Sequence, residues 1–417
     1  MNFILTEKIS KINYFSFIWH GIFLSLASSF MDVHTIIPSM LIKAGGNSIM
    51  LGLLTAIMVG GAGLLQIVFA GFLSNQAHKK KPLLLGINLR IVALLFLSLM
   101  LIKSTSISNT AVIIFIFVLI SLFSFSGSYA YISYVDVMGK SILSEKRKQF
   151  FTVKQTISSL GIFISAIVVS SMLKHFSYPE NYGILFLIAG ILLFIASLGF
   201  WKIEEISTKV MQKHNFKEYL QKIPREISHN SNLKNYLFII NNLGLCFSFI
   251  PFMILFAKKS FGLSYHLIGN FLIYKIVGML VTGFILYKRS QKFEYKKLLY
   301  FSLVIGISLP ILSLIFSNNL FIYQLIFVLS GIFITTYRIS ASGILVEISD
   351  NENRAIYTGI SGAGNILPTI FPLIAGILIS ILGYTITFII VSVIISSSFI
   401  FIAKLDCRKV ALERVKF

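Results

Sequence analysis

The sequence predicts an all-α membrane protein that crosses the bilayer many times, and three observations point to this fold class. Of its 417 residues, 56% are hydrophobic and only 12% are charged, whereas a soluble domain carries about twice that charged fraction. The mean hydropathy is +0.87. Long apolar runs also follow one another along nearly the whole chain, separated by short polar segments. Lipid offers no partner for an unpaired backbone group, so we expect each run to be a helix.

Twelve runs reach the roughly 20 apolar residues that a membrane-spanning helix needs. In chain order they cover residues 15–40, 48–74, 83–103, 109–138, 151–173, 181–201, 235–257, 264–287, 297–316, 319–346, 355–381 and 383–403. The first run has no small-residue cleavage site, so we expect it to be retained as a span and not removed as a signal peptide.

The longest polar stretch, residues 202–234, divides these runs into six and six. We therefore predict an N-terminal six-helix bundle at residues 1–201, a cytoplasmic linker at 202–234, and a C-terminal bundle with a short cytoplasmic tail at 235–417.

The basic residues give the predicted orientation. A net charge of +21 would suggest nucleic acid in a soluble chain, but here the charges lie in short loops between apolar runs. Most of the 36 lysines and arginines lie in the N-terminus, the even-numbered loops and the C-terminus. The odd-numbered loops hold Lys43, Lys103, Lys174, Lys258 and Lys259. By the positive-inside rule, we expect both termini and the linker on the cytoplasmic side of an inner membrane, with lipid and not nucleic acid as the partner.

The two halves of the chain resemble each other weakly. "GFLSNQAHKKKPLLL" (Gly71–Leu85) follows span two, and "GFILYKRSQKFEYKKLL" (Gly283–Leu299) follows span eight. "VDVMGKSILSEKRKQFF" after span four similarly resembles "LVEISDNENRAIY" after span ten. Equivalent points separated by an even number of spans indicate a parallel repeat, related by a pseudo-two-fold axis along the membrane normal.

With this layout, the chain resembles the major facilitator superfamily over nearly its whole length. The loop between spans two and three resembles the signature of that family, with matching residues Gly71, Leu73, Asn75, Lys79 and Lys80. The aspartate usual in the signature is replaced by Asn75, and His78 lies near its expected second glycine. Span four lacks the arginine of many proton-coupled relatives, and span five lacks the glycine-proline motif of drug antiporters. The resemblance therefore implies a solute transporter with alternating access, and not a multidrug exporter.

Asp32 is the foremost candidate for solute binding or ion coupling, because a charged side chain inside the bilayer is costly and usually functional. If residues 15–40 form one helix, a polar stripe runs along one face. The stripe comprises Gly21, Ser25, Ser28, Ser29, Asp32, Thr35 and Ser39. The alternative is a packing face of small residues, with Asp32 in a structural ion pair.

Two cations of the second half are further candidates. Arg338 shares a helix face with Gln324 and Thr335, and the resemblance implies that span ten lines the central cavity. Arginine offers a fork suited to carboxylate or phosphate. Lys275 lies in the middle of span eight, too far from either interface for its side chain to reach water. Both could instead form structural pairs.

The remaining candidates divide into two groups. Uncharged hydrogen-bonding partners for the solute are expected at Tyr131, Asn241 and Asn242. Residues expected to latch the conformational states at the cytoplasmic side are Gly71, Asn75, Lys79, Lys80, Arg90, Asp136, Glu347 and Arg354.

Signs of other chemistry are missing from the sequence. It has no phosphate-binding glycine loop, no zinc-ligand spacing and no loop with paired acids, so we expect no cofactor, no metal and no enzymatic activity. The predicted function is secondary transport of a small solute such as an organic anion by a monomer, coupled to a proton or another cation. One alternative is a facilitative or export carrier for lipophilic compounds. Another is a polytopic membrane enzyme or lipid-handling protein.

Overall fold

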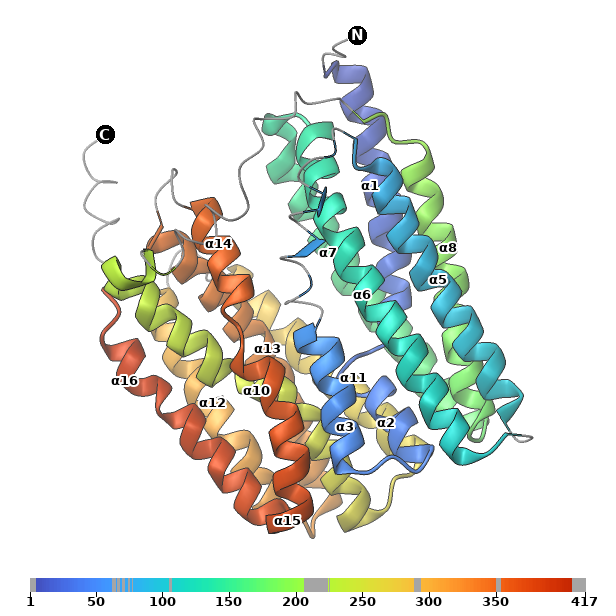
Figure 1. Ribbon diagram of the computed structural model, residues 1–417, viewed down its shortest axis with the longest axis vertical. Coiled ribbons are helices and arrows are strands. Elements are labelled where there is room, and N and C mark those ends of the chain that lie inside the picture. Colours follow the sequence, from blue (N-terminus) through green and yellow to red (C-terminus); the bar gives the residue numbers. More distant parts are fainter. Residues whose placement is uncertain are drawn as a thin grey trace. The chain divides into compact units, whose positions relative to one another are not determined.

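The computed structural model describes residues 5–61, 65, 68–69, 72–73, 76, 78–104, 107–205, 224, 226–288, 294–349 and 354–406. Within these ranges the regular structure is helical. Contacts between residues divide the chain into two compact units, Met1–Gly46 with Gly61–His214, and Asn47–Gly60 with Asn215–Phe417. The helices of both units are labelled in Figure 1.

The first unit is built from long helices that pack along their lengths. They are α1 (Glu7–Ser28), α2 (Ile36–Lys43), α5 (Lys80–Ile102), α6 (Asn109–Ser141), α7 (Ser144–His175) and α8 (Glu180–Trp201). Helix α5 packs against α6 and α8, and α1 packs against α7 and α8. Small residues permit these close approaches: a Cβ atom on Gly199 would lie 2.6 Å from the carbonyl oxygen of Ser16.

The second unit contains the remaining helices. They are α3 (Ser48–Thr55), most of the π-helical turn η1 (Ala56–Gly61), α10 (Ser231–Phe261), α11 (Tyr265–Lys288), α12 (Tyr295–Ile315), α13 (Leu320–Glu347), α14 (Arg354–Ala363), α15 (Leu367–Ser396) and α16 (Ser398–Ala403). Helix α13 packs against α11 and α12, while α10 packs against α15. At the crossing of α11 and α13, Gly331 lies directly against the backbone carbonyl of Lys275.

Helix α3 belongs to the second unit, although the sequence-based division places its residues in the N-terminal bundle. Its contacts explain the difference, because α3 packs against α15. The Ser48 hydroxyl donates a 2.9 Å hydrogen bond to the Gly376 carbonyl, and Gly52 lies against the Pro372 carbonyl. The division into two six-helix bundles with a linker at 202–234 stays a prediction.

Nine stretches of the described residues are long and apolar enough to cross a membrane. The longest, Gly359–Ala403, has 45 residues, which is about 68 Å of helix and too long for a single crossing. Gly383 interrupts it with a φ of 78°, a left-handed conformation that favours glycine. This interruption separates the predicted spans 355–381 and 383–403.

Candidate functional site

Asp32 lies in a break between two helices and not in the middle of one. Helix α1 ends at Ser28, and α2 begins at Ile36. The Asp32 carboxylate oxygen Oδ1 accepts hydrogen bonds from the His34 N–H (3.0 Å), the Thr35 N–H (2.8 Å) and the Thr35 hydroxyl (2.7 Å). An aspartate that binds nearby backbone N–H groups stabilises a turn in competition with the helix. The expectation of one continuous helix over 15–40 is therefore wrong.

The polar stripe predicted along span one depends on that continuous helix, so it is wrong as well. Its serines instead make local and interhelical bonds. The Ser28 hydroxyl donates to the Leu24 carbonyl at 2.7 Å, within its own helix. The Ser29 hydroxyl donates to the Ile162 carbonyl at 2.8 Å, and Ser39 accepts from the Tyr182 hydroxyl at 2.8 Å. These contacts fasten the break to α7 and α8.

Four candidates of the second unit lie on α11 and α13. Lys275 is only 1% exposed, where α11 meets α13. Gln324 accepts a 3.3 Å hydrogen bond from the Asn270 amide, and the Thr335 hydroxyl donates to the Met279 carbonyl at 3.3 Å. The Arg338 guanidinium lies over the Phe247 ring of α10, 5.6 Å from its centroid. One helix pair thus places four of the predicted residues, two of them cations.

Asn241 joins α10 to the junction between α14 and α15. Its amide nitrogen donates to the Gly364 carbonyl at 2.6 Å, and its oxygen accepts from the Leu367 N–H at 2.7 Å. Both ends of the amide are therefore used in holding the junction. The neighbouring Asn242 donates to the Ser397 hydroxyl at 2.8 Å.

A cavity of about 500 Å³ lies beside these asparagines, lined by Ile227, Lys234, Leu237, Phe238, Asn241, Asn242, Ile366, Leu367 and Ile370. Its lining is mainly apolar. Tyr131, the remaining uncharged candidate, lies on α6 in the other unit and has 57% of its surface exposed.

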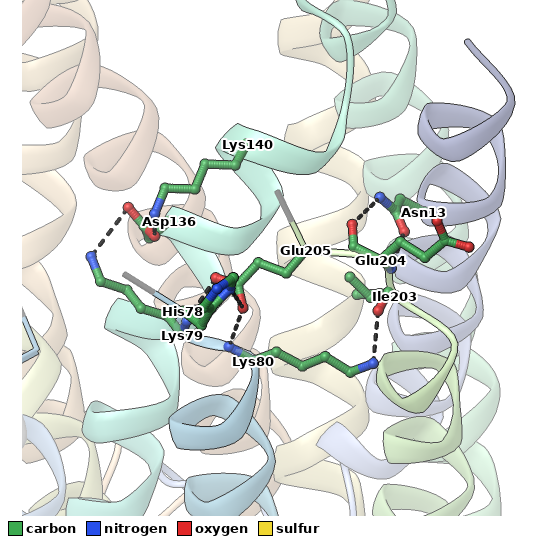
Figure 2. A network of polar contacts seen from close by, with 9 residues as sticks. All are labelled: Asn13, His78, Lys79, Lys80, Asp136, Lys140, Ile203, Glu204 and Glu205. Carbon is green, nitrogen blue, oxygen red and sulfur yellow. Dashed lines mark hydrogen bonds and ion pairs between the residues drawn. The ribbon is translucent and has the colours of Figure 1, made fainter. Parts of the chain in front are cut away.

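The ends of α5, α6 and α8 meet in a charged network (Figure 2). Asp136 near the end of α6 binds two cations: Lys79 Nζ lies 3.2 Å from its Oδ1, and Lys140 pairs with its Oδ2. The Glu205 carboxylate, four residues beyond α8, accepts hydrogen bonds from the Lys79 N–H (2.6 Å) and the Lys80 N–H (2.8 Å). These are among the first backbone donors of α5, which have no partner within the helix.

Lys80 forms further bonds between the same two segments, with its side chain reaching from α5 to the end of α8. Its ammonium donates to the Trp201 carbonyl at 2.8 Å and to the Ile203 carbonyl at 2.7 Å, at the C-terminal end of α8. An anion thus lies at the N-terminus of α5 and a cation at the C-terminus of α8, the arrangement that the helix dipoles favour. Asn13 of α1 exchanges two hydrogen bonds with the backbone of Glu204 (2.9 and 3.0 Å), which anchors the same segment.

The structure brings together Lys79, Lys80 and Asp136 from the predicted latch group. Gly71 and Asn75 lie outside the described residues, as does the side chain of Arg354, the first residue of α14. Glu347 is the last residue of α13 in the other unit.

Arg90, also predicted to belong to the latch, lies elsewhere on α5. It is ten residues beyond Lys80, or about 15 Å along the helix, and its guanidinium lies 4.3 Å from the centre of the Phe123 ring of α6. This distance from the helix end separates it from the network of Figure 2.

Sequence reasoning missed Glu205, Asn13 and Lys154. Glu205 belongs to "KIEE", directly after an apolar run. An acid at this place indicates a helix cap only if the start of another helix is known to lie beside it, and the sequence does not show that. Lys154 of α7 donates a 2.7 Å hydrogen bond to the Tyr134 hydroxyl of α6. The sequence places Lys154 within the predicted span 151–173, apart from the loop lysines, but gives no sign that Tyr134 lies beside it.

Comparisons with known proteins identify the fold. Residues 237–411 match the family model described as Major Facilitator Superfamily. A POT family transporter solved in complex with 5-aminolevulinic acid superposes with a TM-score of 0.70 at 12% identity, covering 94% of this chain and 95% of that one. The nucleoside transporter NupG superposes with a TM-score of 0.61 at 15% identity, covering 97% and 100%. No curated protein sequence matches the chain.

The second half of the chain is thus similar to the Major Facilitator Superfamily, and nearly the whole chain has the fold of these solved transporters. A bacterial homologue of the lysosomal transporter Spinster, with a TM-score of 0.59 at 11% identity over 95% of both chains, has the same fold. The predicted all-α membrane fold is thereby confirmed. At these identities the similarity to solved structures concerns the fold alone.

Proposed function

We propose that this protein is a member of the major facilitator superfamily and a secondary transporter that moves a small solute across the inner membrane by alternating access, coupled to a proton or another cation. The fold and the transporter neighbours support solute transport. One of those neighbours was solved in complex with 5-aminolevulinic acid, and a solute of this size suits the proposal. We further propose that both termini lie in the cytoplasm, because the basic residues are concentrated in those segments and in the even-numbered loops.

Asp32 is the proposed coupling residue, and its position in the helix break supports this role. Its carboxylate is the acceptor for three hydrogen bonds that hold the turn between α1 and α2. A protonated carboxyl is a weaker acceptor than a carboxylate. Protonation at Asp32 therefore loosens the turn, which couples proton binding to the geometry of the break.

The test compares Asp32→Asn with Asp32→Ala in proteoliposomes, with a solute first identified by screening organic acids, phosphates, sugars and nucleosides for binding. Asparagine keeps an oxygen that accepts the three hydrogen bonds but cannot change its charge. We expect Asp32→Asn to retain exchange of solute and to lose accumulation against a gradient. Asp32→Ala should lose both, because it also removes the cap. Full accumulation by Asp32→Asn would exclude this residue from coupling.

A facilitative or export carrier is the second candidate, and the same bonds give a specific reason to consider it. Three local hydrogen bonds account for Asp32 as a structural cap, without any role in ion transfer. On this hypothesis the parent protein equilibrates the solute and never concentrates it, with or without an imposed proton gradient. Measuring accumulation by the parent protein under a pH gradient separates the two candidates.

A further inference from the structure

Two cations of the first unit lie inside its helices and face one side of α6. Phe123, Gly127 and Tyr134 lie within about 60° of one line along that helix. Arg90 of α5 covers the first two: its guanidinium lies 4.3 Å from the centre of the Phe123 ring, and a Cβ atom on Gly127 would lie 3.3 Å from its Nε. Lys154 of α7 reaches the third, with its ammonium 2.7 Å from the Tyr134 hydroxyl.

His20 of α1 lies at the Tyr134 end of this face. Its imidazole ring lies 6.0 Å from the ring of Tyr134. Nδ1 of His20 lies 3.3 Å from the Ala196 carbonyl, so this nitrogen is the donor and holds the ring against α8. Gly21 leaves room beside it, since a Cβ atom there would lie 3.5 Å from Cγ of Lys154.

Neither cation is neutralised by a carboxylate from the described part of the chain. Asp136, the nearest acid along α6, is occupied by Lys79 and Lys140. Nε of Arg90 is enclosed and has no hydrogen-bond partner among the described atoms. A cation without a counter-charge within a membrane span is costly to maintain. Two such cations along one face of α6 therefore indicate a place where an anion binds.

We propose that Arg90 and Lys154 form an oxyanion subsite that binds a carboxylate or phosphate group of the transported solute. This inference rests on the proposed transport function and names the chemical class of the solute. The planar guanidinium binds such a group through two parallel hydrogen bonds, and the ammonium adds a second charge. Tyr134 orients Lys154, and the Gly127 position leaves the space that the guanidinium occupies.

The experiment measures binding by calorimetry on the full chain in phosphatidylcholine nanodiscs, which contain no anionic headgroup to compete. The probes are succinate, inorganic phosphate and the neutral nucleoside uridine. We expect succinate or phosphate to bind saturably, which tells carboxylate from phosphate. Arg90→Gln and Lys154→Gln should each raise the Kd about tenfold or more. Arg90→Lys should lie between them and the parent protein, because it keeps the charge and loses the fork. Lys103→Gln, at the far end of α5, is the matched control and should leave the Kd unchanged.

Three other results would contradict the proposed oxyanion subsite. Binding of uridine without binding of either anion would retain solute transport and exclude the oxyanion subsite. Anion binding that is equally tight in Arg90→Gln and Lys154→Gln would place the anion elsewhere. If no probe binds, the subsite is excluded for carboxylate and phosphate alike. The Arg90→Lys variant keeps the test valid if the neutral variants do not fold. It retains the positive charge at this position and lacks only the guanidinium group, so it must still bind the anion more weakly than the parent protein.

Discussion

The Glu205 carboxylate and the backbone N–H of Lys80 are joined by a 2.8 Å hydrogen bond that links the segment after α8 to the first turn of α5. The Glu205 side chain is only 4% exposed, so water cannot replace it as the acceptor. Lys80 returns the contact by donating to two carbonyls at the end of α8. The start of α5 and the end of α8 thus cap each other, so a substitution at either end should destabilise both.

Removing the Glu205 cap should destabilise the first unit. Glu205→Ala leaves two enclosed N–H groups without an acceptor, which costs about 1–3 kcal/mol, and Glu205→Gln should cost less because it keeps one acceptor oxygen. The measurement is the unfolding midpoint of the purified protein in detergent. Glu204→Gln is the matched control, because that residue is exposed and engages Asn13 through its backbone alone. Equal midpoints for Glu205→Ala and Glu204→Gln would contradict the capping role.

Breaking the ion pair between Lys79 and Asp136 should alter transport without altering solute binding. The pair is partly exposed, so it contributes at most about 1 kcal/mol, and Lys140 still neutralises Asp136 in its absence. We expect Lys79→Gln to change the exchange rate by up to about fivefold, the change that corresponds to 1 kcal/mol. Lys81→Gln provides the comparison, as an exposed lysine in the first turn of α5. A changed Kd in correctly inserted Lys79→Gln protein would move this loop into the binding site.

The junction between α14 and α15 should depend on Asn241 more than on its neighbour. Asn241→Leu removes an acceptor and a donor from two backbone groups, at a cost of about 1–3 kcal/mol for each group left buried without a partner. Asn242→Ala removes one bond to Ser397, at a cost of about 1 kcal/mol. Unfolding midpoints of the two variants should therefore fall in that order. The reverse order would show that Asn241 does not carry the junction.

A methyl group at Gly331 should disrupt the crossing of α11 and α13. A Cβ atom there overlaps the carbonyl of Lys275, and overpacking of this kind costs about 1–3 kcal/mol or more. The control is Gly283→Ala, also on α11, where a Cβ atom meets open space. We expect Gly331→Ala to lower the unfolding midpoint and Gly283→Ala to leave it unchanged or raise it slightly, because alanine favours the helix. If both variants unfold at the same temperature, the helices are farther apart than described.

The long helices were predictable because their apolar runs match the thickness of a bilayer. The run at residues 109–138 became α6 (Asn109–Ser141), and the run at 319–346 became α13 (Leu320–Glu347). The break at Asp32 was not predictable in the same way. Hydropathy averages over a single acid, and the turn depends on local bonds to His34 and Thr35.

The candidate site was harder to predict because its contacts join distant segments. Intramembrane charge alone identified Asp32, Lys275, Arg338 and Arg90 as unusual. It did not place Glu205 beside the start of α5, a contact that spans more than 120 positions of the sequence. It also gave no means of placing Lys154 and Arg90 along one face of α6, which depends on how α5, α6 and α7 pack.

The orientation of the protein gives the last prediction. Lysines and arginines resist transfer across the membrane during insertion, so the loops that hold most of them should remain in the cytoplasm. Reporters fused within residues 202–234, beside Lys79 and after Lys288 should all report the cytoplasm, and those beside Lys43 and Lys258 should report the opposite side. Replacing Lys79, Lys80 and Lys81 with glutamine should weaken this bias only for the loop between spans two and three. An external signal from residues 202–234 would contradict the arrangement of two parallel six-helix halves, because an odd number of crossings would then precede the linker.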